Sequence, residues 1–166
     1  LIGPRWAEWY RPKSRHLLDR KDLERVHDPT YVARLFSEDL EAEIIKTYEL
    51  VDFRGRHHRY EPATATQPLT QLFERIQDRV SGTWQCCTVA LEENFCFYFG
   101  GGMHHAQKSF GKGFCLLNDI VIAIRKLQAE HRIQNAWVID TDAHKGDGTA
   151  ALTAGDTSIL TLSIHM

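Results

Sequence analysis

Apolar residues in the first half of the chain recur every three or four positions, which is the spacing of one helix face. Asp28 followed by Pro29 is typical of a helix start, and the apolar positions that follow it are Val32, Leu35, Phe36 and Leu40. This pattern predicts a helix from Asp28 to about Lys46. The same spacing predicts a second helix over Leu69, Leu72, Phe73, Ile76 and Val80. Residues 54–60 between them, RGRHHRY, predict an exposed loop.

The second half contains short continuous apolar runs at residues 95–99, 136–139 and 159–164. Runs of this length are typical of strands that are covered on both faces. Between the first two runs, Asn118 is placed to cap a helix that extends to about His131. Alternation of strand and helix predicts an α/β protein with an open parallel sheet and helices on both faces. In such sheets, ligands bind at the carboxyl ends of the strands.

Composition narrows the class of protein further. The chain of 166 residues is 43% apolar and 25% charged, as expected of one globular domain. Its 20 basic and 22 acidic residues give a net charge of −2 and form no block of one sign, so direct nucleic-acid binding is not expected. No apolar run reaches the roughly 20 residues that a membrane span needs.

The cysteines also limit the chemistry. Four cysteines without any C-x-x-C spacing predict reduced, mostly buried thiols and an intracellular protein, cytoplasmic or, in a eukaryote, also nuclear. A zinc site built on cysteine needs paired spacings that this chain lacks, so any metal must be held by histidine and carboxylate side chains.

Two polar clusters follow the first two apolar runs: GGGMHHA at residues 100–106 and DTDAHKGDG at residues 140–148. Asp142 and His144 are two residues apart, so in an extended segment their side chains leave on the same side and can bind one metal ion. A carboxylate and an imidazole suit zinc, iron, manganese or cobalt. Asp140 lies on the same side, one step deeper, and suggests a supporting role. The plainer interpretation is an acidic turn that caps the next helix.

His104 and His105 follow three glycines, which allow a tight turn. Two imidazoles at that position can serve as the base and the acid for a water molecule, each oriented by a carboxylate. Asp140 and Asp147 are the carboxylates at hand. Paired histidines are often only surface residues, as we expect of His57 and His58, so this hypothesis depends on the neighbouring aspartate cluster.

These motifs, together with residues 113–115 running into Asn118 and Asp119, resemble the histone deacetylase family of zinc amidohydrolases. The segment from Val26 to Val32 is similar to the part that precedes this core in the family. The resemblance covers residues 26–166. It implies an arginase/deacetylase-like fold that is truncated here, so that residues 1–166 form a single partial catalytic domain.

The resemblance also implies a role for each residue of the site. Asp142 and His144 would bind Zn²⁺, while Asp140 would orient His104 and Asp147 would orient His105. The counterpart of His105 transfers the proton, and that of His104 stabilises charge. Gly113 and Phe114 would bind the substrate, Phe114 as one wall of a narrow tunnel. A buried K⁺ site would be formed by Asp140, Asp142, His144, Ser163 and Ile164.

The family's substrates imply acetyl-lysine or an acetylpolyamine here. Its third zinc ligand, an aspartate, and its catalytic tyrosine would lie beyond Met166, so we expect this chain alone to be inactive and either to self-associate or to pair with a missing carboxyl-terminal half. A catalytically incomplete binding module is the alternative. An arginase-like hydrolase with two manganese ions fits less well, because Asp147 follows His144 one residue too late.

Overall fold

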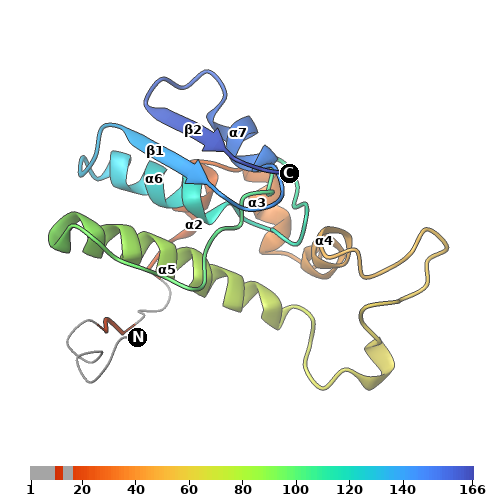
Figure 1. Ribbon diagram of the computed structural model, residues 1–166. Helices are drawn as coiled ribbons and strands as arrows, with labels where there is room; N and C mark the ends of the chain where they lie inside the picture. The colour runs from red at the N-terminus through yellow and green to blue at the C-terminus, as the bar shows by residue number, and fades with distance from the viewer. Residues whose placement is uncertain (1–9, 13–16) are drawn as a thin grey trace.

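The computed structural model describes residues 10–12 and 17–166. Helices occupy the first part: α2 (Arg20–Glu24), α3 (Pro29–Leu35), α4 (Leu40–Thr47), the 3₁₀ turn η2 (Pro62–Thr64) and the long α5 (Gln71–Glu93). They are followed by α6 (Asp119–Ala129), β1 (Ala136–Asp140), α7 (Asp147–Thr153) and β2 (Ile159–Ser163). Figure 1 shows the two strands stacked above α6, with α5 crossing below. No helix among the described residues is long and apolar enough to span a membrane.

The single helix expected from Asp28 to about Lys46 is wrong, because the chain breaks into α3 and α4. Asp28 does cap α3, accepting the N–H of Thr30 at 2.8 Å, and Pro29 is the first helical residue. At the break, the Ser37 hydroxyl donates to the Arg34 carbonyl and accepts the N–H of Asp39. Side-chain bonds of this kind compete with the helical ladder and end α3.

The second helix extends further than the apolar spacing predicts. Instead of ending near Val80, α5 continues to Glu93, where Asn94 takes a left-handed conformation with φ of 66°. An asparagine in that conformation is a common helix terminator.

The strand expected at residues 95–99 is also wrong. This segment forms no strand, and Phe95, Phe97 and Phe99 are exposed. The ring of Tyr98 instead packs against Gly82 of α5, so the segment follows α5 rather than the sheet edge (Figure 1). All four cysteines are free thiols, but only Cys115 is buried, so the expectation that most of them are buried is wrong.

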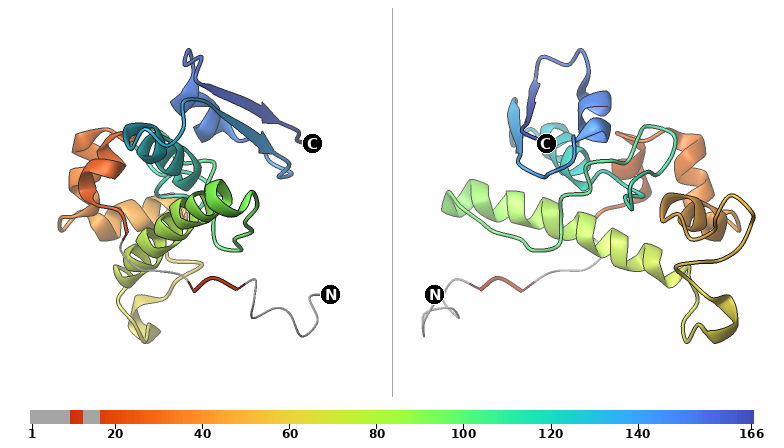
Figure 2. Two further views of the ribbon diagram at one scale, coloured as in Figure 1. Left: turned by 90° about the vertical axis from the view of Figure 1, so that its left-hand side faces the viewer. Right: turned by 45° about the vertical axis from the view of Figure 1, so that its right-hand side comes forward.

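The parallel sheet and the helix before its first strand are confirmed. Strands β1 and β2 are parallel, with Val138 opposite Thr161 and Asp140 opposite Ser163. Helix α6 is capped by Asn118, whose side-chain oxygen accepts the N–H of Val121 at 3.1 Å. Its Ile124 packs with the inward side chains of the strands, while Figure 2 shows the two strands lying to one side of the helical part.

Helical cover is present on one face of this sheet only, among the residues that the structure describes. The other face presents four large apolar side chains to solvent, in two cross-strand pairs: Trp137 with Leu160 and Ile139 with Leu162.

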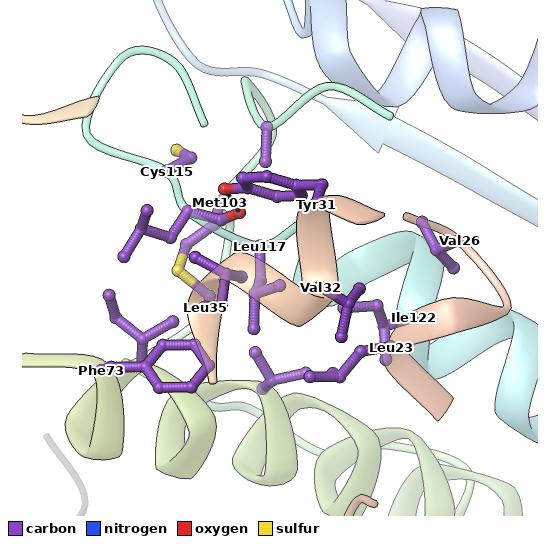
Figure 3. Packing of buried hydrophobic residues seen from close by; sticks show 14 of the residues in the cluster. Leu23, Val26, Tyr31, Val32, Leu35, Phe73, Met103, Cys115, Leu117 and Ile122 are labelled. Atoms are coloured by element: carbon purple, nitrogen blue, oxygen red, sulfur yellow. Dashed lines mark hydrogen bonds between the residues drawn. The ribbon is translucent and has the colours of Figure 1, made fainter. Parts of the chain in front are cut away.

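The main core lies between α3, α5 and α6, as Figure 3 shows. Tyr31, Val32 and Leu35 of α3 pack against Phe73 of α5 and Ile122 of α6. The Tyr31 hydroxyl donates to the Leu116 carbonyl at 2.8 Å, which satisfies its one buried polar group. This core also includes Met103 and Cys115, so it anchors the chain on either side of the His104–His105 pair.

Candidate active site

The two polar clusters do meet at the carboxyl end of β1. Met103 and Ala106, on either side of the histidine pair, are buried in the core, so the two imidazoles are presented from a fixed support. Asp140 is the last residue of β1, and Asp147 is the first residue of α7. The histidine pair, Asp140 and Asp147 therefore lie at the carboxyl end of β1, which is where parallel sheets of this kind bind their ligands.

Each imidazole is paired with one carboxylate. His104 Nδ1 lies 2.6 Å from Asp140 Oδ2, and His105 Nδ1 lies 2.6 Å from Asp147 Oδ1. A carboxylate accepts, so in both rings Nδ1 carries the proton and Nε2 is the free nitrogen. The ring centroids of the two histidines are 4.1 Å apart. The two imidazoles therefore stand side by side, with their ring planes inclined at 52°.

Asp142 and His144 stand next to this pair. The Oδ1 atom of Asp142 lies 3.0 Å from His144 Nδ1 and 3.8 Å from His104 Nε2. Both side chains are open to solvent, with 52% of Asp142 and 78% of His144 exposed, whereas the His104 side chain is only 8% exposed. Hydrogen bonds from the backbone N–H and side chain of His144 lower the pKa of Asp142. Asp142 is therefore an ionised carboxylate next to an accessible imidazole.

The cleft beside these residues has a volume of about 460 Å³. His104, Asp140 and Asp142 line it, together with Gly101, Gly102, Ile120, Val138, Ile139 and Thr141. His105, His144 and Phe114 do not line this cleft. The His105 ring is 6.1 Å from the His144 ring, centroid to centroid, so the two histidines still face a common region.

Gly113 and Phe114 reach the site from the far side of His105. A Cβ atom at Gly113 would lie 2.6 Å from His105 Cδ2, so the backbone touches the imidazole. Gly113 and Phe114 both have positive φ, 53° and 64°. The half-exposed Phe114 ring packs beside Tyr48, with centroids 5.9 Å apart, and the Gly113 carbonyl accepts the Cys115 thiol at 3.3 Å.

The residues named for potassium lie at the same end of the sheet. Asp140 is opposite Ser163 in the strand register, and the Asp140 carbonyl accepts the N–H of Ile164 at 2.8 Å. The Ser163 hydroxyl accepts the N–H of Gly146 at 3.3 Å. The backbones of Asp140 and Ile164 are thus joined by a hydrogen bond. Asp142 and His144 lie on the loop that follows β1.

Two side chains that support the site were not predicted from the sequence. Lys112 donates to Asp147 Oδ2, the oxygen that His105 does not use. Burial alone would raise the pKa of Asp147, but hydrogen bonds from Lys112 and His105 outweigh it and lower that pKa. Nothing in the spacing of Lys112 points to this contact, because the partners are 35 residues apart.

The second supporting group is Asp119, a fully buried carboxylate at the start of α6. It accepts the N–H groups of Gly102 and Met103, at 3.0 and 2.7 Å, and the Thr83 hydroxyl at 2.5 Å. Burial raises the pKa of Asp119. By holding the backbone just before His104, Asp119 fixes the direction in which the histidine pair leaves the core. The sequence could have pointed to Asp119, because this residue follows Asn118 in the motif shared with the family.

Fold and site together define an α/β protein with a polar site at the carboxyl end of a parallel sheet, built from paired imidazoles and carboxylates. Residues 7–166 match the sequence profile of the histone deacetylase domain. The chain therefore belongs to the histone deacetylase domain family.

Individual relatives agree with this assignment. An uncharacterized protein of Picosynechococcus sp. is 33% identical over 94% of this chain and 46% of its own length. Histone deacetylase HDAC1 of Drosophila melanogaster is 30% identical over 97% of this chain and 29% of its own. Acetoin utilization protein AcuC of Staphylococcus aureus is 47% identical over 68 residues, which are 41% of this chain and 17% of its own.

The fold has a solved counterpart as well. The crystal structure of an HDAC homolog from Aquifex aeolicus superposes with a TM-score of 0.68 at 24% identity, covering 92% of this chain and 39% of that one. The chain thus spans less than half the length of these relatives. At this identity the superposition establishes the arginase/deacetylase-like fold and nothing further.

Proposed function

We propose that the protein hydrolyses an acyl amide, with acetyl-lysine or an acetylpolyamine as the substrate. Membership of the histone deacetylase domain family and the similarity to histone deacetylase HDAC1 support deacetylation as the general class of reaction. The observation that carries the proposal is the pair of imidazoles whose Nδ1 atoms each lie 2.6 Å from a carboxylate, next to Asp142 and His144. Paired, oriented imidazoles are suited to proton transfer at an amide.

Asp142 and His144 would hold Zn²⁺. Their donors, a carboxylate oxygen and an imidazole nitrogen, are those that zinc takes, and the two atoms lie 3.0 Å apart at an exposed position. Bound there, the ion would act as a Lewis acid that polarises the acyl carbonyl and lowers the pKa of water. No group of three or more histidine, cysteine or carboxylate side chains comes together as a metal site within residues 10–12 and 17–166.

The histidines would move the protons. With Nδ1–H donated to Asp147, His105 Nε2 is free to accept a proton from the attacking water and later to give it to the leaving amine as the C–N bond breaks. Ionised Asp147 stabilises the imidazolium that forms in between. His104, fixed by Asp140, would hydrogen-bond to the oxygen on which negative charge develops.

Gly113 and Phe114 would position the substrate. The carbonyl of Gly113, whose backbone touches the His105 ring, would accept the N–H of the scissile amide. Phe114 would pack along the apolar stem of the acylated side chain, because half of its ring is open to solvent beside Tyr48.

We also propose that K⁺ binds at the end of the sheet, through Asp140, Asp142, His144, Ser163 and Ile164. Carbonyl and hydroxyl oxygens are hard donors, which suits a hard monovalent cation. A bound cation would stiffen the loop that carries Asp142. Thermal unfolding in KCl should then occur at a higher temperature than in choline chloride of equal ionic strength, and equal Tm values would count against the site.

The deciding experiment is release of acetate from an acetyl-lysine peptide and from an acetylpolyamine. The full-length protein that contains residues 1–166 is assayed after treatment with a chelator, and again after addition of Zn²⁺ or Mn²⁺. We expect activity to return with zinc and to follow one equivalent of metal. Full activity in chelator, or an optimum at two manganese ions, would reject the proposal; Asp147 already disfavours the two-manganese alternative, because it is bonded to His105 and Lys112.

A binding module without catalysis is the second candidate, favoured by the absence of a third converging metal ligand in the described part of the chain. It predicts that an acetyl-lysine peptide binds and dissociates unchanged. Mass spectrometry of the peptide after prolonged incubation with zinc and the protein separates the two candidates.

A further inference from the structure

We propose that Arg59, together with Arg54, recognises acidic side chains that flank the acylated lysine of the substrate. This inference rests on the proposed function and narrows its substrate class to acyl-lysine in an acidic segment, rather than a cationic polyamine. The two arginines belong to the loop of residues 52–60, called the basic loop below, in which residues 53–59 are all exposed.

A short series of contacts links the basic loop to the catalytic histidines. Gly113 touches the ring of His105, and Phe114 follows it. The Arg59 guanidinium lies 5.3 Å from the centroid of the Phe114 ring. Arg59 therefore lies beside Phe114, the ring along which the substrate stem would lie, and is placed to meet residues that flank an acylated lysine.

The charge of the basic loop is incompletely neutralised. Arg56 forms an ion pair with Asp52, with 2.9 Å between the guanidinium nitrogen and the carboxylate oxygen. Arg59 has only a loose partner, Glu49, at 3.8 Å with both side chains about half exposed or more. The Arg54 guanidinium lies over the highly exposed ring of Phe53, at 5.1 Å, and pairs with no carboxylate of the described residues. Two arginines thus remain available in a chain whose net charge is −2.

The basic side chain next to Gly113 in the sequence does not compete for this role. Lys112 precedes Gly113 but donates to Asp147, so its charge is used inside the site. A positive rim that faces solvent attracts an acidic peptide and repels an acetylpolyamine, which carries ammonium groups of the same sign as the loop. The effect acts mainly on association and weakens with salt.

The test uses three acetyl-lysine peptides of equal length, with the flanking positions all Glu, all Gln or all Lys. We expect kcat/KM of the zinc-loaded full-length protein to be about tenfold higher for the Glu peptide than for the Lys peptide at low salt. At 0.5 M salt the ratio should approach one. N-acetylspermidine should be a poorer substrate than the Gln peptide.

Substitutions assign the preference to the loop. Arg59→Gln should remove most of the Glu-over-Lys ratio, Arg59→Glu should reverse it, and Arg54→Gln should reduce it. Arg20→Gln is the matched control: Arg20 also makes an ion pair, with Glu24, and lies over a phenylalanine, Phe36, but in α2 and away from the site. Its ratio should equal that of the unmodified protein.

Fluorescence anisotropy of the same labelled peptides gives a readout that does not need turnover. Failure of the proposed function shows as no acetate from any peptide, and the inference is then judged on affinity alone. Equal affinities for the Glu and Lys peptides, or a preference that survives Arg59→Gln, would overturn it. A Glu preference lost in Arg59→Gln and kept in Arg20→Gln would support it.

Discussion

The buried imidazole of His27 accepts the backbone N–H of Asn118, with 3.0 Å between Nε2 and the backbone nitrogen. Its other nitrogen, Nδ1, donates to the Gln107 carbonyl at 2.8 Å. Only the neutral imidazole can make both bonds, because protonation would turn Nε2 into a second donor facing an N–H. His27 thus joins the loop after the histidine pair to the residue that caps α6.

This arrangement predicts a loss of stability in mild acid. Burial lowers the pKa of His27 to about 4, from 6.5. Between these values the unfolded chain binds a proton that the native protein does not, so stability falls as the pH falls. The total loss is about 3 kcal/mol, at about 1.4 kcal/mol per pKa unit. Urea unfolding of the protein and of His27→Gln from pH 7 to 4.5 measures it; parallel curves for the two would contradict the assignment.

Asp119 should be critical for both stability and geometry. Asp119→Asn replaces one accepting oxygen with an amide that faces buried donors, which should cost about 2–4 kcal/mol. Thr83→Val removes only one of three donors and should cost about 1 kcal/mol. Thermal unfolding gives both values. A stability of Asp119→Asn equal to that of the unmodified protein would show that the carboxylate does not hold the Gly102–Met103 backbone.

The sequence predicted the parts of the fold that depend on local signals. The Asp28 and Asn118 caps are confirmed because each depends on a few neighbouring residues. The parallel pairing of β1 with β2 is confirmed because the two apolar runs are joined by a short crossover that contains α7. The strand expected at residues 95–99 is wrong because a strand needs a partner, and apolarity alone does not supply one. The break between α3 and α4 depends on a side-chain bond of Ser37, which an apolar pattern does not report.

Only part of the candidate site could be predicted from the sequence. The pairing of His104 with Asp140 is implied by the resemblance to the family, and the two side chains do lie 2.6 Å apart, although the apolar run before His104 forms no strand. The contacts of Lys112 and Arg59 could not be predicted, because each reaches the site through loops whose course no periodicity describes. Metal ligation itself stays a prediction, since donors only bind an ion when their spacing and number suit it.

Removal of either expected metal ligand should release zinc. Asp142→Ala and His144→Ala each delete one donor, and zinc affinity should fall at least about 100-fold, because loss of a direct ligand should exceed the 10–100-fold effect of an outer partner. Competition with a chromogenic chelator measures the affinity. His57→Ala, an exposed histidine of the basic loop, is the control and should bind zinc normally. Unchanged affinity in Asp142→Ala would remove that residue from the site.

His105→Ala should lower turnover far more than substrate affinity. A group that transfers protons acts mainly in the transition state, so kcat should fall about 10²–10⁴-fold with KM little changed. His104→Ala should have a milder effect, because its expected role is to stabilise charge. Steady-state kinetics of the full-length protein at fixed zinc concentration provide both parameters. If kcat of His105→Ala matched that of the unmodified protein, His105 would have no place in the mechanism.

Gly113 should tolerate no side chain, for two separable reasons. Its φ of 53° disfavours any residue with a Cβ, and that Cβ would lie 2.6 Å from the His105 ring. Gly55 has a similar φ of 77° but no atom within 4 Å of its Cβ position, so Gly55→Ala carries the backbone strain alone. We expect about 1 kcal/mol of destabilisation for Gly55→Ala and about 1–3 kcal/mol more for Gly113→Ala, from crowding. Only Gly113→Ala should also lower kcat, because it displaces the imidazole; equal stability and equal kcat in the two variants would show that Gly113 does not press on His105.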